Sequence, residues 1–260
     1  MTRTATADLS RLDILPPRAR GGHKRSDNIA CIMEAVAFIA GEPWSDHPDC
    51  ACPVISAFLR SWNDALPDSE RDALLRPLVL LMVNTRSTKD VERCRAMMAA
   101  DWLIREHTPA WLRLAGLTAQ ADALAGMPEI TDMVQCLPLM PTLDAVQKNA
   151  NAARAAAWTA AWTAAKAAAG DTAWDAAGDA AWTIAWTAAG AAACDAAGAA
   201  AGDTARAAAW AVAGDAARNA ACDAARAVAW AGAGDALKPT TDFLQQSALA
   251  LVHRMIGAAA

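Results

Sequence analysis

The stretch ARAAAWTAAWTAAKAAAGDTAWDAAGDAAWTIAWTAAG, residues 153–190, opens a tract in which every fourth residue is alanine without a miss up to Ala233. The other three positions of this tetrapeptide repeat differ in chemistry. The first position holds the cysteines, the basic residues and nearly all the glycines of the tract, and the second holds its aspartates. The first position also holds every tryptophan of the tract: Trp158, Trp162, Trp174, Trp182, Trp186, Trp210 and Trp230.

The composition and period of the tract favour helices. Alanine has the highest helix propensity of all residues. Positions four apart advance by about 40° around a straight helix, so one straight helix cannot keep the tryptophans on a single face. The tract therefore forms either a right-handed superhelix or a series of short helices. Gly-Asp pairs, such as Gly170-Asp171 and Gly234-Asp235, are typical of a glycine that ends one helix and an aspartate that caps the next, and they favour short helices.

Two other interpretations of the tract stay open. A β-solenoid also has a short period, although alanine is depleted in strands. Alternatively, the tract arose by expansion of a short coding repeat, and its regularity then carries no information about function. The separation of tryptophan and aspartate into different repeat positions favours a product that folds.

Length and composition indicate a division of the chain into parts. The 260 residues allow one large domain, or one domain with an appendage, and the composition changes near Pro141. We expect an all-α protein in which a compact N-terminal helical domain precedes the repeat module and an amphipathic helix closes the chain. The expected parts are a polar leader (1–27), the N-terminal helical domain (28–140), the repeat module (142–238) and a C-terminal helix (239–257) that packs back on the N-terminal domain.

Charge and hydropathy exclude several classes of protein. The net charge is −5, and basic residues are not gathered as in a nucleic-acid-binding protein. Residues 1–20 lack the apolar segment of a secretory signal, and the longest apolar stretches, Ile29–Ala40 and Leu78–Val83, are too short to span a bilayer. We therefore expect a cytoplasmic protein without nucleic-acid or membrane partners, whose seven cysteines are free thiols or ligands.

Apolar periodicity predicts the helices on either side of the tract. A core helix is expected over Asn28–Ala40, capped by Ser26 or Asp27 and ended by Gly41, because its apolar residues run almost all round. Two further helices are predicted over Val54–Trp62, after Pro53, and from Asp68 or Ser69 to a break at Pro77. Another begins at the capping-box-like pair Ser87 and Asp90 and runs to about Glu106, and a short one runs from Thr108-Pro109 through Leu114. The last predicted helix is Asp242–Ile256, whose apolar residues on one side are Phe243, Leu244, Leu251, Val252, Met255 and Ile256.

The loop EPWSDHPDCACP, residues 42–53, concentrates side chains that bind metals. His47, Cys50 and Cys52 lie within six residues, and Cys31 or His23 could supply a fourth ligand. Zinc prefers tetrahedral sets of sulfur and nitrogen ligands, so zinc is the one cofactor that the sequence suggests. The C-x-C spacing is less typical of zinc sites than C-x₂-C. The alternative is a loop packed by Trp44 and apolar cysteines.

Catalytic signals are sparse. The sequence has no G-x-S-x-G, H-E-x-x-H, P-loop or G-x-G-x-x-G motif. Cys50 beside His47 resembles a nucleophile and base, but no third group is present to orient the base. Glu34 in an apolar helix could have a raised pKa, although pairing with Arg60 or Arg93 is the simpler interpretation. Asp101 and Glu106 are expected on a solvent-exposed face. These observations favour a non-enzymatic protein without excluding an enzyme.

First-position residues of the tract are the candidates for a partner-binding surface. Tryptophan and arginine are enriched in interface hot spots. Tryptophans at helical spacing are also common packing residues, so the same side chains have a structural interpretation. The candidate partner-binding residues are Trp182, Trp186, Trp210, Arg218 and Trp230.

One segment has a recognisable likeness. The segment GGHKRSDNIACIMEAVAFIAGEPWSDHPDCACPVISAFLRSWNDALPD, residues 21–68, resembles a group of uncharacterised proteins from high-GC actinobacteria and their phages. Members of that group often carry an alanine- and tryptophan-rich tail and a closing amphipathic helix like Gln246–Ile256. The resemblance implies a phage or mobile-element setting and brings no activity with it.

Together these patterns predict a non-enzymatic, all-α interaction or scaffold protein. The N-terminal domain and the final helix would hold the repeat module so that its exposed residues contact a protein partner. An alternative is a metal- or small-molecule-binding protein centred on the His47, Cys50 and Cys52 loop. A further alternative is self-association through the tract.

Overall fold

The structure, a computed structural model, describes residues 5–132, 135, 138, 140–168 and 234–258. This part of the chain is all-α, as the sequence predicts, with one isolated backbone bridge between Arg18 and Ala30. Short 3-10 turns, η1 (Leu9–Leu12) and η2 (Arg25–Asp27), precede the first helix. The helices are α1 (Ile32–Ala40), α2 (Pro53–Ala65), α3 (Asp68–Leu75), α4 (Leu78–Met82), α5 (Lys89–Trp102), the π-helical turn η3 (Leu103–His107), α6 (Thr108–Leu114), α7 (Thr118–Ala125), α8 (Met140–Ala168) and α12 (Gly234–Gly257).

Helix α1 is the most buried element of the described residues, since all nine of its residues are buried. The predicted start at Asn28 is wrong, because Asn28 has a left-handed backbone (φ 55°) and Ala30 is held in the bridge to Arg18. The cap is Cys31, whose Sγ accepts the backbone N–H of Glu34 while the Glu34 carboxylate accepts the backbone N–H of Cys31. Gly41 ends the helix with φ 69°, as expected for a C-terminal glycine.

The boundaries of the following helices are set by caps and prolines. Helix α2 begins at Pro53, which suits the first turn because proline has no N–H to donate there. Helix α3 begins at Asp68, and Pro77 separates it from α4. The predicted cap at Ser87 is wrong by one residue: the Thr88 hydroxyl accepts the Val91 N–H (3.4 Å), which places Asp90 inside the first turn.

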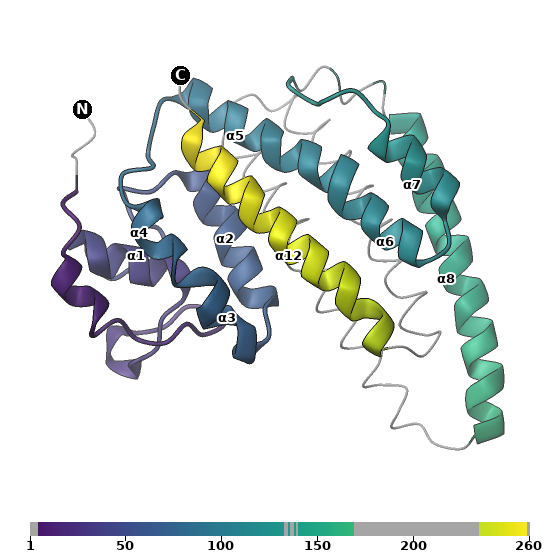
Figure 1. Cartoon of the computed structure of the whole chain (residues 1–260), viewed down its shortest axis with the longest axis horizontal. Coiled ribbons are helices and arrows are strands. Elements are labelled where there is room, and N and C mark those ends of the chain that lie inside the picture. Colours follow the sequence, from purple (N-terminus) through teal and green to yellow (C-terminus); the bar gives the residue numbers. More distant parts are fainter. Residues whose placement is uncertain (1–4, 133–134, 136–137, 139, 169–233, 259–260) are drawn as a thin grey trace.

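Helices α5, η3 and α6 form one continuous rod, and α12 lies along it (Figure 1), while α2 packs against both α5 and α12. The buried row of α12 consists of Leu244, Ala248, Leu251, Val252 and Met255. Phe243, predicted on the same face, is 52% exposed because it lies one position away from this row. The helix is also longer than predicted, since it includes Pro239 and extends from Gly234, where the described part resumes.

Arg95 of α5 fixes the C-terminal end of α12. Its guanidinium is buried and donates to the backbone oxygens of Met255 (Nε, 2.7 Å) and Thr85 (Nη1, 2.6 Å). The last carbonyls of a helix have no partner within the helix and carry partial negative charge. Arg95 therefore satisfies one of them and ties α12 to α5 and to the loop before it.

Segments outside the predicted N-terminal domain contribute to the same core. The predicted leader packs along α1: Asp8 N–H donates to Ile39 O (2.9 Å), and the Leu15 side chain is buried. On the other side, Leu143, Val146 and Ala150 of α8 are buried in the core, although the sequence assigns them to the repeat module. Helix α8 carries the first tetrads as one continuous helix through Ala168, and the tract from residue 169 to 233 lies outside the described residues.

Substitution of Arg95 by alanine should lower the free energy of unfolding by about 3 kcal/mol, because two buried carbonyl oxygens lose a charged donor. Arg93→Ala is the control. Its pair with Asp90 is exposed, and its loss should cost roughly 0.5 kcal/mol or less. Urea titrations followed by circular dichroism measure both values, and equal costs would contradict the role given to Arg95.

Candidate functional site

A cavity of about 320 Å³ lies between α2, η3, α6 and α12. Its volume falls within the range of small-molecule sites, which begins at about 300 Å³. The walls come from segments far apart in the sequence, so only docking of α12 creates the cavity. Apolar lining residues include Trp62, Ala65, Leu66, Pro67, Trp102, Trp111, Leu237, Leu244 and Ala248.

The three tryptophans belong to the most buried part of the cavity lining, together with His107 and Ala248, since each of these residues is at most 2% exposed. Trp62 and Trp102 flank Phe58 in edge-to-face contacts, with ring centroids 6.2 Å and 5.6 Å from it. Such contacts hold rings in fixed positions beyond what burial alone provides. The Trp102 Nε1–H also donates to the Ser247 hydroxyl (2.6 Å) on α12. These contacts therefore hold Trp62 and Trp102 in place at the buried part of the lining.

His107, at the end of the π-helical turn, is a buried titratable group of this cavity. Burial lowers its pKa to about 4, so the ring is neutral at physiological pH. Its Nε2 lies 3.3 Å from Trp111 Nε1. Because the indole N–H can only donate, Nε2 is the acceptor and the neutral ring carries its proton on Nδ1. Nδ1 is buried and has no hydrogen-bond partner among the described residues. Single π turns are frequent at functional sites.

Polar groups line the more exposed part of the cavity and form its mouth. The Gln245 side-chain amide donates to the Glu70 carboxylate (2.6 Å), which joins α12 to α3. Lys238 Nζ lies 2.8 Å and 2.9 Å from the two carboxylate oxygens of Asp242. Thr241 completes the polar lining. The cavity thus has an apolar interior and a charged mouth.

The predicted metal-binding residues lie in different surroundings. His47 is 67% exposed, and its Nδ1 lies 2.6 Å from Asp46 Oδ1. Cys31, Cys50 and Cys52 are buried in the hydrophobic core, where Cys31 caps α1. No three His, Cys, Asp or Glu side chains in the described ranges are arranged to hold a metal ion. Zinc binding by the loop stays a prediction.

Cys31 and the loop residue Cys50 are also poor candidates for a nucleophile. Burial raises the pKa of the Cys50 thiol to about 11 and that of Cys31 to about 12. A thiol must lose its proton to act as a nucleophile. A second cavity, of about 740 Å³, lies beside Cys50 and is lined by Glu42, Asp49 and Arg86, but the Glu42 carboxylate is already used by the backbone N–H groups of Asp49 and Cys50.

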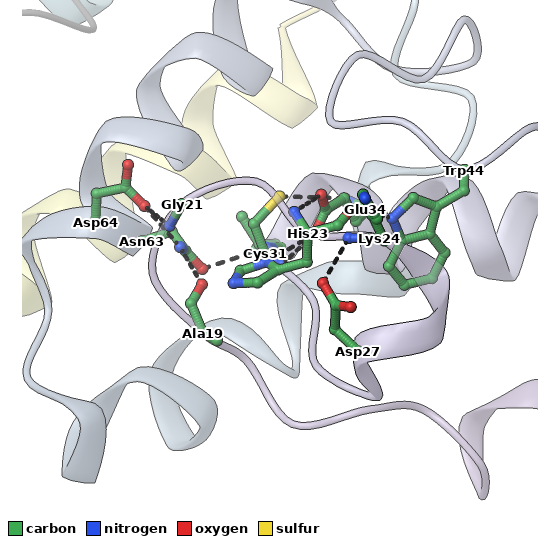
Figure 2. A network of polar contacts seen from close by, with 11 residues as sticks. Ala19, Gly21, His23, Lys24, Asp27, Cys31, Glu34, Trp44, Asn63 and Asp64 are labelled. Carbon is green, nitrogen blue, oxygen red and sulfur yellow. Dashed lines mark hydrogen bonds and ion pairs between the residues drawn. The ribbon is translucent and has the colours of Figure 1, made fainter.

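Glu34 has a structural role, and the predicted pairing with Arg60 or Arg93 is wrong. Its carboxylate accepts the backbone N–H of His23 (2.6 Å) and that of Cys31 (2.7 Å), and lies 3.1 Å from His23 Nδ1 (Figure 2). Trp44 Nε1 donates to the His23 carbonyl (2.7 Å) and extends this network. The network ties the segment before α1 to its N-terminus.

The solvent-exposed face that the sequence predicts for Asp101 and Glu106 is wrong for Asp101, whereas the Glu106 side chain is 39% exposed. Asp101 is 17% exposed, accepts the backbone N–H of Ile130 (2.8 Å) and pairs with Arg105. Its burial raises its pKa. Glu106 accepts the Ser247 hydroxyl of α12. Both carboxylates thus contact segments that are distant in the sequence, which no local pattern reveals.

The sequence offers little functional signal for the cavity. Trp62 and Trp102 fit an apolar helical stripe, and His107 with Trp111 four residues later resembles an ordinary core pair. The predicted partner-binding residues lie outside the described part of the chain: Trp182, Trp186, Trp210, Arg218 and Trp230.

Comparisons with known proteins were negative. No protein-family model matches the chain, and no curated protein or solved structure matches it. The resemblance of residues 21–68 to actinobacterial and actinophage proteins stays a prediction. Among the helices of the described residues, none combines the length and the apolarity that crossing a membrane requires.

His107 should make stability depend on pH. Its folded-state pKa of about 4 lies below the unfolded value near 6.5, so the unfolded state binds more protons between these values and stability falls as the pH falls through this window. The loss should reach on the order of 3 kcal/mol at pH 4, and His107→Gln should remove it. Urea titrations from pH 4 to 7 test this against His253→Gln, which changes an exposed histidine and should keep the wild-type pH dependence.

Proposed function

We propose that this protein binds a small, largely apolar molecule in the cavity between α2, η3, α6 and α12. The observation that carries the proposal is the cavity itself: a space of about 320 Å³ whose interior is lined by three tryptophans and several leucines. Removing apolar surface of a ligand from water supplies affinity of about 25 cal/mol per Å². Polar groups at the mouth orient a ligand, as in small-molecule sites generally.

The cavity favours binding over catalysis. No serine or cysteine occurs among the described residues that line it. The pKa of His107 is lowered to about 4, which makes the ring a weak base at neutral pH, and its Nε2 lone pair already accepts a hydrogen bond from Trp111. The ring is therefore not poised as a general base. The proposed ligand site lies in a different place from the His47 loop.

A neutral fluorescent probe tests the proposed site. N-phenyl-1-naphthylamine should bind the full chain saturably, with an increase in its fluorescence. Ala248→Leu should weaken that binding by about tenfold or more, because Ala248 lines the cavity and the added branched side chain occupies ligand space. Ala250→Leu makes the same change at an exposed position of α12 and should leave binding unchanged.

Circular dichroism of both variants separates loss of the site from loss of the fold. Absence of saturable probe binding to the wild type would contradict a ligand site. Equal effects of the two substitutions would place the probe elsewhere on the protein.

A second candidate function is the interaction or scaffold role predicted from the tract, and one observation favours it. Leu143, Val146 and Ala150 of α8 belong to the same core as Leu237, Leu244 and Leu251 of α12. These residues precede and follow the tract, so both flanks of the tract are held by one core. Anchored flanks reduce the conformational freedom that a repeat module would lose on binding a protein partner. Self-association through the tract is a variant of the same proposal.

Alanine substitutions in the full chain test the tract. Replacing Trp182, Trp186, Trp210 and Trp230 by alanine, with Arg218→Ala, should abolish capture of a partner from host lysate, because buried tryptophan and arginine contribute most to interface affinity. Trp174→Ala is the control within the same repeat position. Light scattering at increasing protein concentration detects self-association, and a partner retained by the multiple variant would assign binding to another surface.

A further inference from the structure

We infer that the ligand of the α2, η3, α6 and α12 cavity is an amphiphilic organic cation, whose apolar body fills the cavity and whose ammonium group lies at the mouth. This inference rests on the proposed ligand-binding function and adds the chemical class of the ligand. It follows from the distribution of charge over the residues that line the cavity.

The charged groups are confined to the mouth and carry a net negative charge. They are the carboxylates of Glu70 and Asp242 and the ammonium group of Lys238. Lys238 Nζ contacts both oxygens of Asp242, so these two charges largely compensate each other. Glu70 accepts a hydrogen bond from the neutral amide of Gln245 and has no ion pair with any described residue. The carboxylate of Glu70 is therefore the charged group of the mouth without a direct ionic contact among the described residues.

The local field favours positive charge at the mouth. The pKa of Lys238 is raised, chiefly by its hydrogen bond to Asp242 and by the charge of Asp242, and the charge of Glu70 contributes in the same direction. An ammonium group of a ligand beside Glu70 would be attracted by the same carboxylate, whereas the hydrogen bonds to Asp242 are already made by Lys238. A carboxylate or phosphate group there would be repelled.

The interior of the cavity does not oppose this arrangement. His107 is neutral, so it adds no positive charge that would repel a cation. The other deep residues, Trp62, Trp102 and Trp111, are aromatic, and the electron-rich faces of such rings attract cations rather than anions. A charge buried in such an interior would lose its hydration, so the ammonium group stays at the solvated mouth and the apolar part enters.

Three probes with the same six-carbon chain separate charge from apolar contact: hexyltrimethylammonium, 1-hexanol and hexanesulfonate. Isothermal titration calorimetry with the full chain should show hexyltrimethylammonium binding at least about threefold more tightly than hexanesulfonate, as expected for a partly screened carboxylate. The preference should shrink in 0.5 M NaCl, because salt screens exposed charges. Hexanol should bind without dependence on salt.

Variants at the mouth assign the preference to its residues. Glu70→Gln should remove most of the difference between cation and anion, and hexanol binding to the same variant measures any effect that does not depend on ligand charge. Glu129→Gln, at an exposed position that does not line the cavity, should change none of the three affinities. Asp242→Asn leaves Lys238 without its close partner and should shift the preference toward hexanesulfonate, so it tests the same assignment independently of Glu70.

The outcomes are distinguishable. Equal affinity for the two charged probes, or a preference for hexanesulfonate, would overturn the cation inference while hexanol binding keeps the ligand site. Failure of all three probes to bind would overturn the ligand site and the inference together. A preference for the cation that persists in Glu70→Gln and in Asp242→Asn would also overturn the assignment to the mouth.

Discussion

The docking of α12 against α2, α5 and α6 is the contact on which the rest of this structure depends. Leu251 and Val252 are completely buried in it, and Arg95 holds the last turn of α12 by its carbonyl oxygens. This contact joins residues more than 140 positions apart, as in the bond from Trp102 to Ser247. It closes the core, forms one wall of the cavity and fixes the chain where it leaves the tract. A change that releases α12 would affect all three features together.

Burial determines the chemistry of the titratable groups near this core. His107 is kept neutral because no charged partner compensates its loss of hydration. Cys31 and Cys50 are kept protonated for the same reason. Glu34 is also buried, but its carboxylate receives backbone N–H groups of His23 and Cys31, so it serves as a fixed acceptor. Cys50 and Glu34, the candidate reactive groups of the sequence, are thus held in unreactive forms. The charged groups of the cavity, Glu70, Asp242 and Lys238, lie at its mouth.

The two proposed functions are compatible because they use different parts of α12. The inner face of α12 borders the cavity, and residue 234, at the start of its described part, directly follows the tract. A ligand in the cavity would contact Leu237 and Leu244, which are part of the core that holds the flank of the tract. Ligand binding and presentation of the tract would then share one structural support, and the stability of α12 docking would influence both.

The sequence by itself determined the helical class and several helix ends. Proline at Pro53 and Pro77 and glycine at Gly41 restrict the backbone wherever they occur, so these ends could be read directly. The start of α1 could not, because the bridge from Arg18 to Ala30 excludes Asn28 from the helix and leaves Cys31 as the cap. The partners of Glu34, Asp101 and Glu106 were missed because they come from other segments. Only the tertiary structure decided the cavity, since its walls join residues 62–111 to residues 237–248. Local propensity acts over a few residues, whereas a cavity depends on which distant surfaces pack together.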